Sequence, residues 1–308
     1  MRSALAFVLL GVLSCSASET GDGAPSASGS AARPPARPAL QVPLPVRPSA
    51  DPNPLGLPPR KLELAVGARV FAVPEAMLRG AKTGSSFQLR ATTVTGKDGD
   101  NLLVDGRDGP NYAIHPSYLL PLQSIPRPRL NAPVAAEWAG VLRHGVVRKY
   151  VKDKIVVRFT DTNDKGERTL DSAQIMPVTD GFHAGNFAVR RDTSAKPTEP
   201  GSDYEHLLLV SALGATDQKD ANEWLALGYG GAAVRVLTSE LLPVPVSYEP
   251  KEGARVWVEH LGRMREALVR DVDRPGLMTV RFERAGRPLQ VGWGQVMPPA
   301  SPGGGRPR

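Results

Sequence analysis

The stretch SAQIMPV at residues 172–178 returns about 120 residues later as WGQVMPP at residues 293–299. Two further sections also close on two apolar residues followed by proline, LLP at residues 119–121 and LLP at residues 241–243. A structural unit that was copied along the chain produces such regular spacing. Proline has no N–H to donate, so it suits the end of a strand that stops pairing. The sequence therefore predicts four repeated sections, each ending in a strand.

The four sections form two matching pairs, the first with the third and the second with the fourth, at an offset of about 122 residues. The first and third share residues 102–103 with 224–225, residues 117–121 with 239–243, and FAV at 71–73 with FAV at 187–189. The second and fourth share Val134/Val256, Glu137/Glu259, Gly140/Gly262, Arg143/Arg265, Val147/Val269, Arg148/Arg270 and VRF at 157–159 with VRF at 280–282. These matches predict that a module of two sections was duplicated.

Each section has the pattern of short strands. In KIVVRF, Ile155, Val157 and Phe159 recur with the period of two that is typical of a half-buried strand, and MTVRF at residues 278–282 repeats the pattern. Thirty prolines and thirty-one glycines supply turns between such runs. About five short strands per section can cover a core only by curling into a small barrel, and barrels of this size need neighbours for support.

We therefore predict an all-β fold of four tandem small five-stranded barrels in two duplicated pairs. The expected barrels span residues 61–125, 130–179, 181–246 and 248–299, and a disordered tail follows at residues 300–308. A signal peptide at residues 1–14 and a tether at residues 15–60 precede them. The tether is rich in proline, alanine and serine, a composition that favours disorder with extended polyproline segments reaching up to about 100 Å.

The chain opens with MRSALAFVLLGVLSC, a positive charge at Arg2 followed by an apolar run that is too short to span a membrane and is typical of an export signal. Residues 12–15, VLSC, resemble the lipobox of bacterial lipoproteins, in which the cysteine is acylated and becomes the mature N-terminus. The resemblance implies lipidation of Cys15, the only cysteine of the chain. Ser16 in place of aspartate implies the periplasmic face of the outer membrane. Ordinary cleavage after Ala17 is the alternative.

The second section resembles a Tudor or Agenet-type domain, a small barrel of the Src-homology kind. The resemblance rests on Trp138, Gly140, Val147, Val157, Phe159, Asp161 and Pro177. The fourth section keeps Gly262, Val269, Val280, Phe282 and Pro298, but has His260 in place of the tryptophan and Arg284 in place of the aspartate. GARV at residues 67–70 recurs at residues 253–256, which links the first section to the same fold.

Tudor-type readers hold a methylated cation in a cage of aromatic rings. The resemblance therefore implies a ligand site at Trp138, Phe159 and Asp161, and in the fourth section the candidates are Trp257, His260 and Phe282. Phe159 and Phe282 also alternate with valines in the way core residues do. Trp138 and Trp257 have two open interpretations, contact with a ligand or packing of one barrel against the next.

The remaining chemistry predicts no enzyme, no cofactor and no metal, because the five histidines lack metal-ligand spacing and no nucleophile or phosphate-binding motif occurs. Lys and Arg are interleaved with Asp and Glu despite a net charge of +7, so we do not expect a nucleic-acid partner. We expect a non-catalytic, lipid-anchored binding or scaffold protein of the cell envelope, with the membrane and a protein or peptidoglycan as partners. The alternatives are a Tudor-like reader of methylated ligands or nucleic acid, and the substrate-holding part of a cell-wall enzyme.

Overall fold

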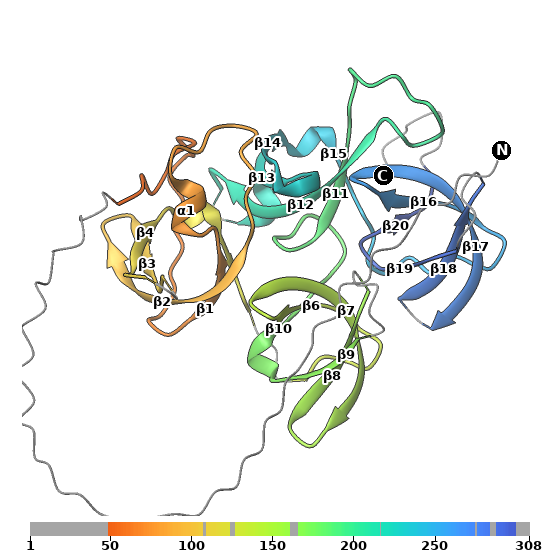
Figure 1. Cartoon of the computed structure of the whole chain (residues 1–308), viewed down its shortest axis with the longest axis horizontal. Helices are drawn as coiled ribbons and strands as arrows, with labels where there is room; N and C mark the ends of the chain where they lie inside the picture. The colour runs from red at the N-terminus through yellow and green to blue at the C-terminus, as the bar shows by residue number, and fades with distance from the viewer. Residues whose placement is uncertain are drawn as a thin grey trace, which may run out of the picture. The chain divides into compact units, whose positions relative to one another are not determined.

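The computed structural model describes residues 49–106, 109–123, 127–160, 166–215, 217–274, 276–283 and 288–299 (Figure 1). Their regular structure is almost entirely strand, with the four-residue helix α1 (Glu75–Leu78) and several short 3-10 turns, so the predicted all-β class is confirmed. The predicted signal peptide, Cys15, the tether up to residue 48, Asp161 and the tail from residue 300 lie outside the described residues.

The first half of the fold contains two groups of five antiparallel strands. In each group four strands pair in chain order and the fifth returns to pair with the first. Group 1 consists of β1 (Arg69–Ala72), β2 (Arg90–Asp98), β3 (Asn101–Val104), β4 (Tyr112–Ile114) and β5 (Leu119–Pro121). Group 2 consists of β6 (Pro133–Trp138), β7 (Val141–Val151), β8 (Lys154–Phe159), β9 (Glu167–Leu170) and β10 (Ile175–Pro177). The 3-10 turns η1 (Pro116–Tyr118) and η2 (Ser172–Gln174) precede the closing strands.

The second half has the same order of pairing. Group 3 consists of β11 (Phe187–Arg191), β12 (Tyr204–Leu213), β13 (Glu223–Leu227), β14 (Ala233–Leu237) and β15 (Leu241–Pro243), with the turns η3 (Gln218–Asp220), η4 (Tyr229–Gly231) and η5 (Thr238–Glu240). Group 4 consists of β16 (Arg255–His260), β17 (Arg263–Arg274), β18 (Leu277–Phe282), β19 (Leu289–Gly292) and β20 (Val296–Met297). The strands of each group fall inside one of the four predicted sections.

The groups are joined in twos into two ten-stranded sheets. Arg90 of β2 pairs with Val141 of β7 and joins groups 1 and 2, while Glu205 of β12 pairs with Arg263 of β17 and joins groups 3 and 4. Each joint lies between the second strands of its two groups. All four groups belong to one compact unit, Pro48–Arg308.

The same turn leads into the first strand of every group. A residue with positive φ donates its N–H to a carbonyl of the second strand at 2.8–2.9 Å, as Gly67 does to Val94, Asn131 to Val147, Gly185 to Leu209 and Gly253 to Val269. A bulge follows directly after that carbonyl residue in each second strand. The GARV recurrence marks this turn in groups 1 and 4. In groups 2 and 3 the hydrogen bonds repeat although the residues differ.

The closing stretches that first indicated the repeat have a common hydrogen bond. Oε1 of Gln174 accepts the backbone N–H of Asp171 at 3.0 Å, and Oε1 of Gln295 accepts the backbone N–H of Gly292 at 3.1 Å. The residue after each glutamine, Ile175 or Val296, is buried. The repeated letters therefore encode a capped turn that feeds the closing strand into the core.

The strand registers test the sequence alignment directly. Trp138 pairs with Val141, and at the corresponding place in group 4 His260 pairs with Arg263, as the aligned positions require. The FAV alignment is wrong by two residues, because Phe71 pairs with Leu120 whereas Val189 pairs with Leu242. Phe71 therefore corresponds to Val189. A slip of two keeps every side chain on its face of the strand, so the alternation could not reveal it.

The predicted disordered tether is also wrong over its last part. Residues 49–60 lie against group 1, where the side chain of Leu57 is buried in the core. The N–H of Leu55 donates to the hydroxyl of Tyr118 at 3.1 Å, and the N–H of His115 donates to the carbonyl of Pro52 at 3.0 Å. The prediction was based on the proline-rich composition of the whole segment. It did not take into account that two leucines and a few backbone groups near its end can bind to a folded surface.

Candidate functional site

The predicted cage in group 2 brings two of its rings together. The centroids of Trp138 and Phe159 are 6.5 Å apart with a tilt of 37°. Phe159 is only 4% exposed and belongs to the core with Val147 and Val157. The guanidinium of Arg168 lies 4.9 Å from the centre of the Trp138 ring. A cation of the chain itself therefore takes the position that a methylated ligand would use, and Asp161 lies outside the described residues.

The corresponding place in group 4 is filled in a similar way. The rings of His260 and Phe282 are 5.2 Å apart, and Phe282 is 4% exposed within its core cluster. The guanidinium of Arg265 lies 5.0 Å from the centre of the Phe282 ring. Arg265 also forms an ion pair with Glu199, which comes from the loop between β11 and β12 of group 3. This aromatic site therefore serves the contact between groups 3 and 4.

Trp257 lies at that same contact. Its ring centroid is 4.9 Å from that of Tyr204 in group 3, and the indole is buried. A Cβ at Gly201 of group 3 would lie 3.1 Å from the indole, so the backbone there approaches the ring closely. The contacts of Trp257 are therefore those of a residue that packs one group against the next. Trp138, by contrast, contacts side chains of its own group.

A cluster of four rings, which we call the ring cluster, connects groups 2, 3 and 4. It consists of His144, Phe187, His206 and Trp293. The centroid of Phe187 lies 4.4 Å from that of His144 and 4.6 Å from that of His206. Trp293 meets His144 edge to face at 5.1 Å. Aromatic pairs at these separations stabilise a contact beyond the apolar area that they bury.

Three hydrogen bonds from the ring cluster cross between groups. Nε2 of His144 bonds the carbonyl of Gly185 at 2.9 Å, Nε2 of His206 bonds the carbonyl of Gly294 at 2.7 Å, and Nε1 of Trp293 donates to the carbonyl of Gly145 at 2.7 Å. A carbonyl only accepts, so each imidazole carries a proton on Nε2. Burial lowers the pKa of His206, which keeps its ring neutral at pH 7.

Close approach of the backbone at this interface depends on glycine. Gly294 has a φ of +78°, and a Cβ there would lie 2.5 Å from the ring of Phe187. Glycine alone meets both conditions, because an L side chain would be strained in this conformation and would overlap the ring.

Group 1 is attached to group 3 by backbone and side-chain contacts. The N–H of Phe87 donates to the carbonyl of Gly231 at 2.8 Å, and the N–H of Ala233 donates to the carbonyl of Ser85 at 2.9 Å. The hydroxyl of Ser211 donates to the carbonyl of Ser117 at 2.8 Å in a buried position. Together with the ring cluster, these contacts link all four groups.

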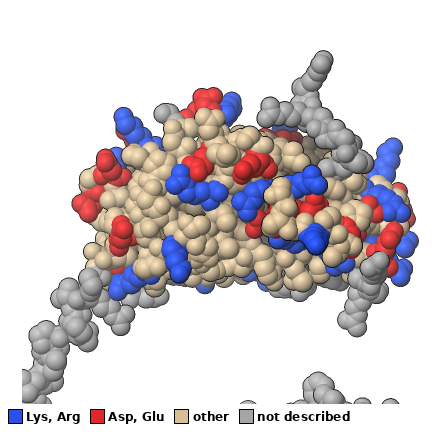
Figure 2. Space-filling model, turned by 90° about the horizontal axis from the view of Figure 1, so that it is seen from above, with Lys and Arg blue, Asp and Glu red and all other residues tan. Residues whose placement is uncertain are grey.

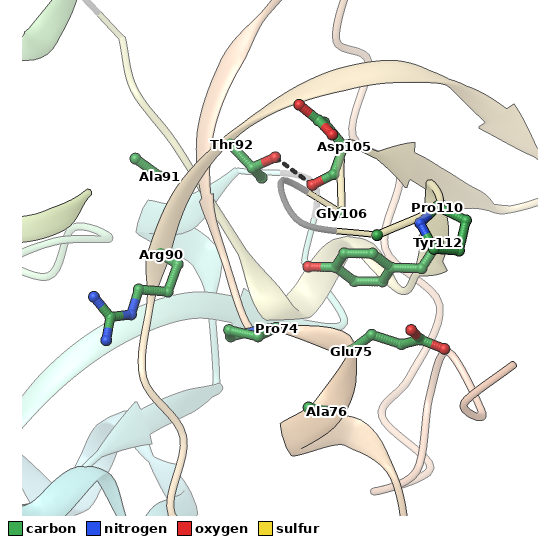
Figure 3. Close-up of a pocket in the computed structure, with 11 residues that line it drawn as sticks. Pro74, Glu75, Ala76, Arg90, Ala91, Thr92, Asp105, Gly106, Pro110 and Tyr112 are labelled. Carbon is green, nitrogen blue, oxygen red and sulfur yellow. Dashed lines mark hydrogen bonds between the residues drawn. The ribbon is translucent and has the colours of Figure 1, made fainter. Parts of the chain in front are cut away.

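A pocket of about 550 Å³ lies in group 1 between α1 and strands β2 and β4 (Figure 3). The ring of Tyr112 crosses it, with the hydroxyl donating to the carbonyl of Val73 at 3.0 Å. The hydroxyl of Thr92 donates to the carbonyl of Asp105 at 2.7 Å on one wall, and Oε1 of Glu75 accepts the N–H of Ala50 at 3.1 Å on the other. These groups already have partners, and the volume lies within the range of small-molecule sites, about 300–1,000 Å³.

Several observations concern the other predictions. Within the described part of the chain, no three His, Cys, Asp or Glu side chains lie close enough to hold a metal ion. No helix among the described residues is long and apolar enough to cross a membrane.

On the face that Figure 2 shows, Lys and Arg lie beside Asp and Glu. The ion pair of Arg190 with Glu205 at 2.6 Å and that of Arg235 with Glu223 at 2.7 Å are examples of this mixing.

The sequence did not single out the ring cluster. A usable signal was present, because each of its members stands where the matching group has a different kind of residue. The strand registers and the closing turn place His144 with Glu266, Phe187 with Arg69, His206 with Ala91 and Trp293 with Ser172. A comparison that seeks identical residues passes over such positions.

Comparison with models of known protein families gave no match, and comparison with curated proteins gave no similar sequence.

Proposed function

We propose that the chain is a non-catalytic, lipid-anchored binding or scaffold protein of the bacterial cell envelope. In this proposal Cys15 carries the lipid, residues 16–48 form the tether, and the four strand groups present a fixed surface to a protein or cell-wall partner. The observation that carries the proposal is the ring cluster, whose buried hydrogen bonds hold groups 2, 3 and 4 in one arrangement. A platform with fixed parts loses little conformational freedom when it binds.

We further propose that each strand group is a small barrel and that a module of two barrels was duplicated. The common pairing order, the shared turn before each first strand and the bulge after it support a common unit. The equivalent joints at Arg90 with Val141 and at Glu205 with Arg263 support a duplication of pairs. Independent origins would not place bulges and joints at matching registers.

The Tudor-like reader is less well supported. Its defining feature is an aromatic face open to a cation, and at Trp138 that face is in contact with Arg168. A methylated ligand would have to displace this guanidinium, and its own contact with the ring would have to offset the contact that is lost.

The proposed lipid anchor at Cys15 is tested with the variant Cys15→Ala in the native host, and Ser16→Ala is the matched control. Lipidation at Cys15 predicts that Cys15→Ala abolishes the processing sensitive to globomycin and releases the protein from the membrane fraction, whereas Ser16→Ala stays bound. Unchanged processing and fractionation of Cys15→Ala would show that the chain is not anchored there.

The proposed binding surface of the four strand groups is tested by crosslinking in intact cells followed by capture of the full chain. We expect a reproducible partner with the wild type and with Ser172→Ala, and loss of that partner with Trp293→Ala, which disturbs the ring cluster. Capture of the same partner by Trp293→Ala in equal amount would contradict a role for the fixed arrangement.

A further inference from the structure

A smaller pocket of about 200 Å³ lies where the segment before group 1, the end of group 2 and the start of group 3 meet. We call it the Arg60 pocket. Its polar lining comes from distant parts of the chain: Arg60, Gln123, Thr179, His183, Asn186 and Gln218. The apolar lining includes Leu62, Met176 and Pro177. Neither aspartate nor glutamate is among the described residues that line it.

Arg60 is a partly buried cation without a carboxylate. Its Nη1 donates to the carbonyl of Pro116 at 2.9 Å and, more weakly, to that of Leu119 at 3.5 Å. Among the described residues, Nε and Nη2 have no partner, and no carboxylate oxygen lies within 4 Å of the guanidinium. Burial lowers the pKa of Arg60 to about 10, so the side chain stays charged at pH 7. A buried charge of this kind is costly unless it is paired.

The charge of Arg60 also acts on its surroundings. Burial first, and then the positive charge of Arg60, lower the pKa of His115. The charge of Asp100 has the opposite and smaller effect on this pKa.

The neighbouring side chains shape the Arg60 pocket, and some of them add hydrogen-bond donors. Oε1 of Gln218 accepts the N–H of Ala184 at 2.9 Å, which orients the amide so that its NH₂ is the group left to donate. The NH₂ of Asn186 donates to the carbonyls of Thr179 and Gly181 at 2.6 and 2.9 Å and so fixes the turn that forms one wall. His183 and Gln123 supply further groups that can donate.

We propose that the Arg60 pocket binds a carboxylate group of the partner, such as the C-terminal carboxylate of a peptide. The Nε and Nη2 atoms of Arg60 form one edge of the guanidinium, and this edge matches the two oxygens of a carboxylate. The apolar lining at Leu62 and Met176 then contacts the small side chain next to that carboxylate. This inference rests on the proposed binding function, for which it supplies the chemistry of the partner.

The test is a titration of the purified full chain with N-acetylalanine, with N-acetylalaninamide as the neutral control and inorganic phosphate as a second anion, followed by ligand-observed NMR. We expect the carboxylate to bind and the amide not to bind. Arg60→Gln lowers the affinity by about tenfold or more, since it removes charge-assisted hydrogen bonds. Arg235→Gln, which alters a surface arginine paired with Glu223, leaves the affinity unchanged.

A second variant covers the case in which Arg60→Gln does not fold. Gln218→Glu puts a negative charge into the pocket and is expected to weaken N-acetylalanine binding by a similar factor while the melting temperature shows a folded protein. Equal binding of N-acetylalanine and its amide, or full affinity in the folded variants, would overturn the proposal. Binding of phosphate but not of N-acetylalanine would overturn the choice of a carboxylate.

The outcomes also separate this inference from the proposed function. If a partner is captured in cells but N-acetylalanine does not bind, the pocket assignment fails and the binding function stands. If N-acetylalanine binds through Arg60 but no partner is captured in cells, the pocket stands and the proposed platform function fails.

Discussion

Ser172 and Trp293 occupy the same place in two matching turns and have different surroundings. Each stands two residues before the glutamine that caps its turn, Gln174 or Gln295. Ser172 lies half-buried within group 2. Trp293 is 3% exposed and donates a hydrogen bond to Gly145 of another group. The capping hydrogen bond is the same in both turns, but the backbone before the glutamine differs, because residues 172–174 form a 3-10 turn whereas Gly294 has a φ of +78°. Trp293 and Gly294 together convert the turn in group 4 into an interface.

This difference separates two kinds of position in the fold. Positions that agree between matching groups, such as the capping glutamines and the buried valines, build the strands and turns of each group. Positions that differ between matching groups build the contacts between groups. Examples are His144, which is equivalent to Glu266, and Phe187, which is equivalent to Arg69. Residues shared by matching groups thus build each group, and residues that differ between matching groups build the contacts that hold the groups together.

The largest expected effect comes from Trp293→Ala. Removing a buried tryptophan from an interface should lower the free energy of unfolding by about 3–5 kcal/mol, because it leaves a cavity and removes the hydrogen bond to the carbonyl of Gly145. Ser172→Ala, at the matching position, should change it by less than about 0.5 kcal/mol. Urea unfolding followed by circular dichroism measures both. Equal losses in the two variants would erase the difference between the two turns.

Gly294→Ala and Gly253→Ala form a second matched comparison, since their φ angles are +78° and +79°. A Cβ at Gly253 would meet nothing within 4 Å, so alanine there costs about 1 kcal/mol for the backbone conformation alone. At Gly294 the overlap with Phe187 adds about 1–3 kcal/mol. Thermal melting of both variants checks this order. The interface would not require the glycine if Gly294→Ala were the milder change.

The ring cluster also predicts a pH dependence of stability. Burial lowers the pKa of His206 below the ordinary value of 6.5 and outweighs the opposite effects of the hydrogen bond to Gly294 and the charge of Glu259. Between the lowered pKa and 6.5 the unfolded chain binds more protons than the folded one, so the free energy of unfolding rises with pH. The contribution is present above pH 6.5 and is lost as the pH falls below it. Its slope for one proton is at most about 1.4 kcal/mol per pH unit.

The check is urea unfolding at several pH values between about 5 and 8, the range in which histidine titrates. His206→Gln keeps a donor near Gly294 and removes the titrating group, so it should flatten the profile in part. His115, whose pKa burial also lowers, keeps the remaining slope of the same sign. An identical profile in the variant and the wild type would show that His206 is not a source of the dependence.

The smallest effect concerns the pair of Arg168 and Trp138. A double-mutant cycle with Arg168→Ala and Trp138→Leu should give a coupling of about 0.5–1 kcal/mol, the range for a cation above a ring at a surface. This value would confirm that the ring face of Trp138 binds the guanidinium of Arg168 from the same group. A coupling of zero would leave the face open and strengthen the comparison with a ligand-binding cage.

Much of the fold could be predicted from the sequence. The alternation of Ile155, Val157 and Phe159, the turn residues and the recurring apolar pair before proline sufficed to predict an all-β chain. The register in β1 and β11 was missed by two residues because only cross-strand pairing distinguishes positions on one face. The folded part begins before residue 60 because Leu57 contacts a core that local composition does not reveal.

The candidate site was harder to predict. Phe159 and Phe282 were recognised as possible core residues from their alternation, and both lie in a core. Whether Trp138 or Trp257 packs between groups depends on residues distant in sequence, such as Tyr204 and Arg168. The same holds for the Arg60 pocket, whose lining is assembled from segments on both sides of group 2. Such sites require the arrangement of the groups, which a periodic pattern does not contain.

The central claim is that the diverged positions fasten the four groups into a single cooperative unit. Its most direct test is hydrogen exchange of the full chain in increasing urea, read by mass spectrometry for peptides from each group. The account predicts one common urea midpoint for groups 1 to 4 in the wild type and in Ser172→Ala, and separate midpoints in Trp293→Ala. Four different midpoints in the wild type would contradict it.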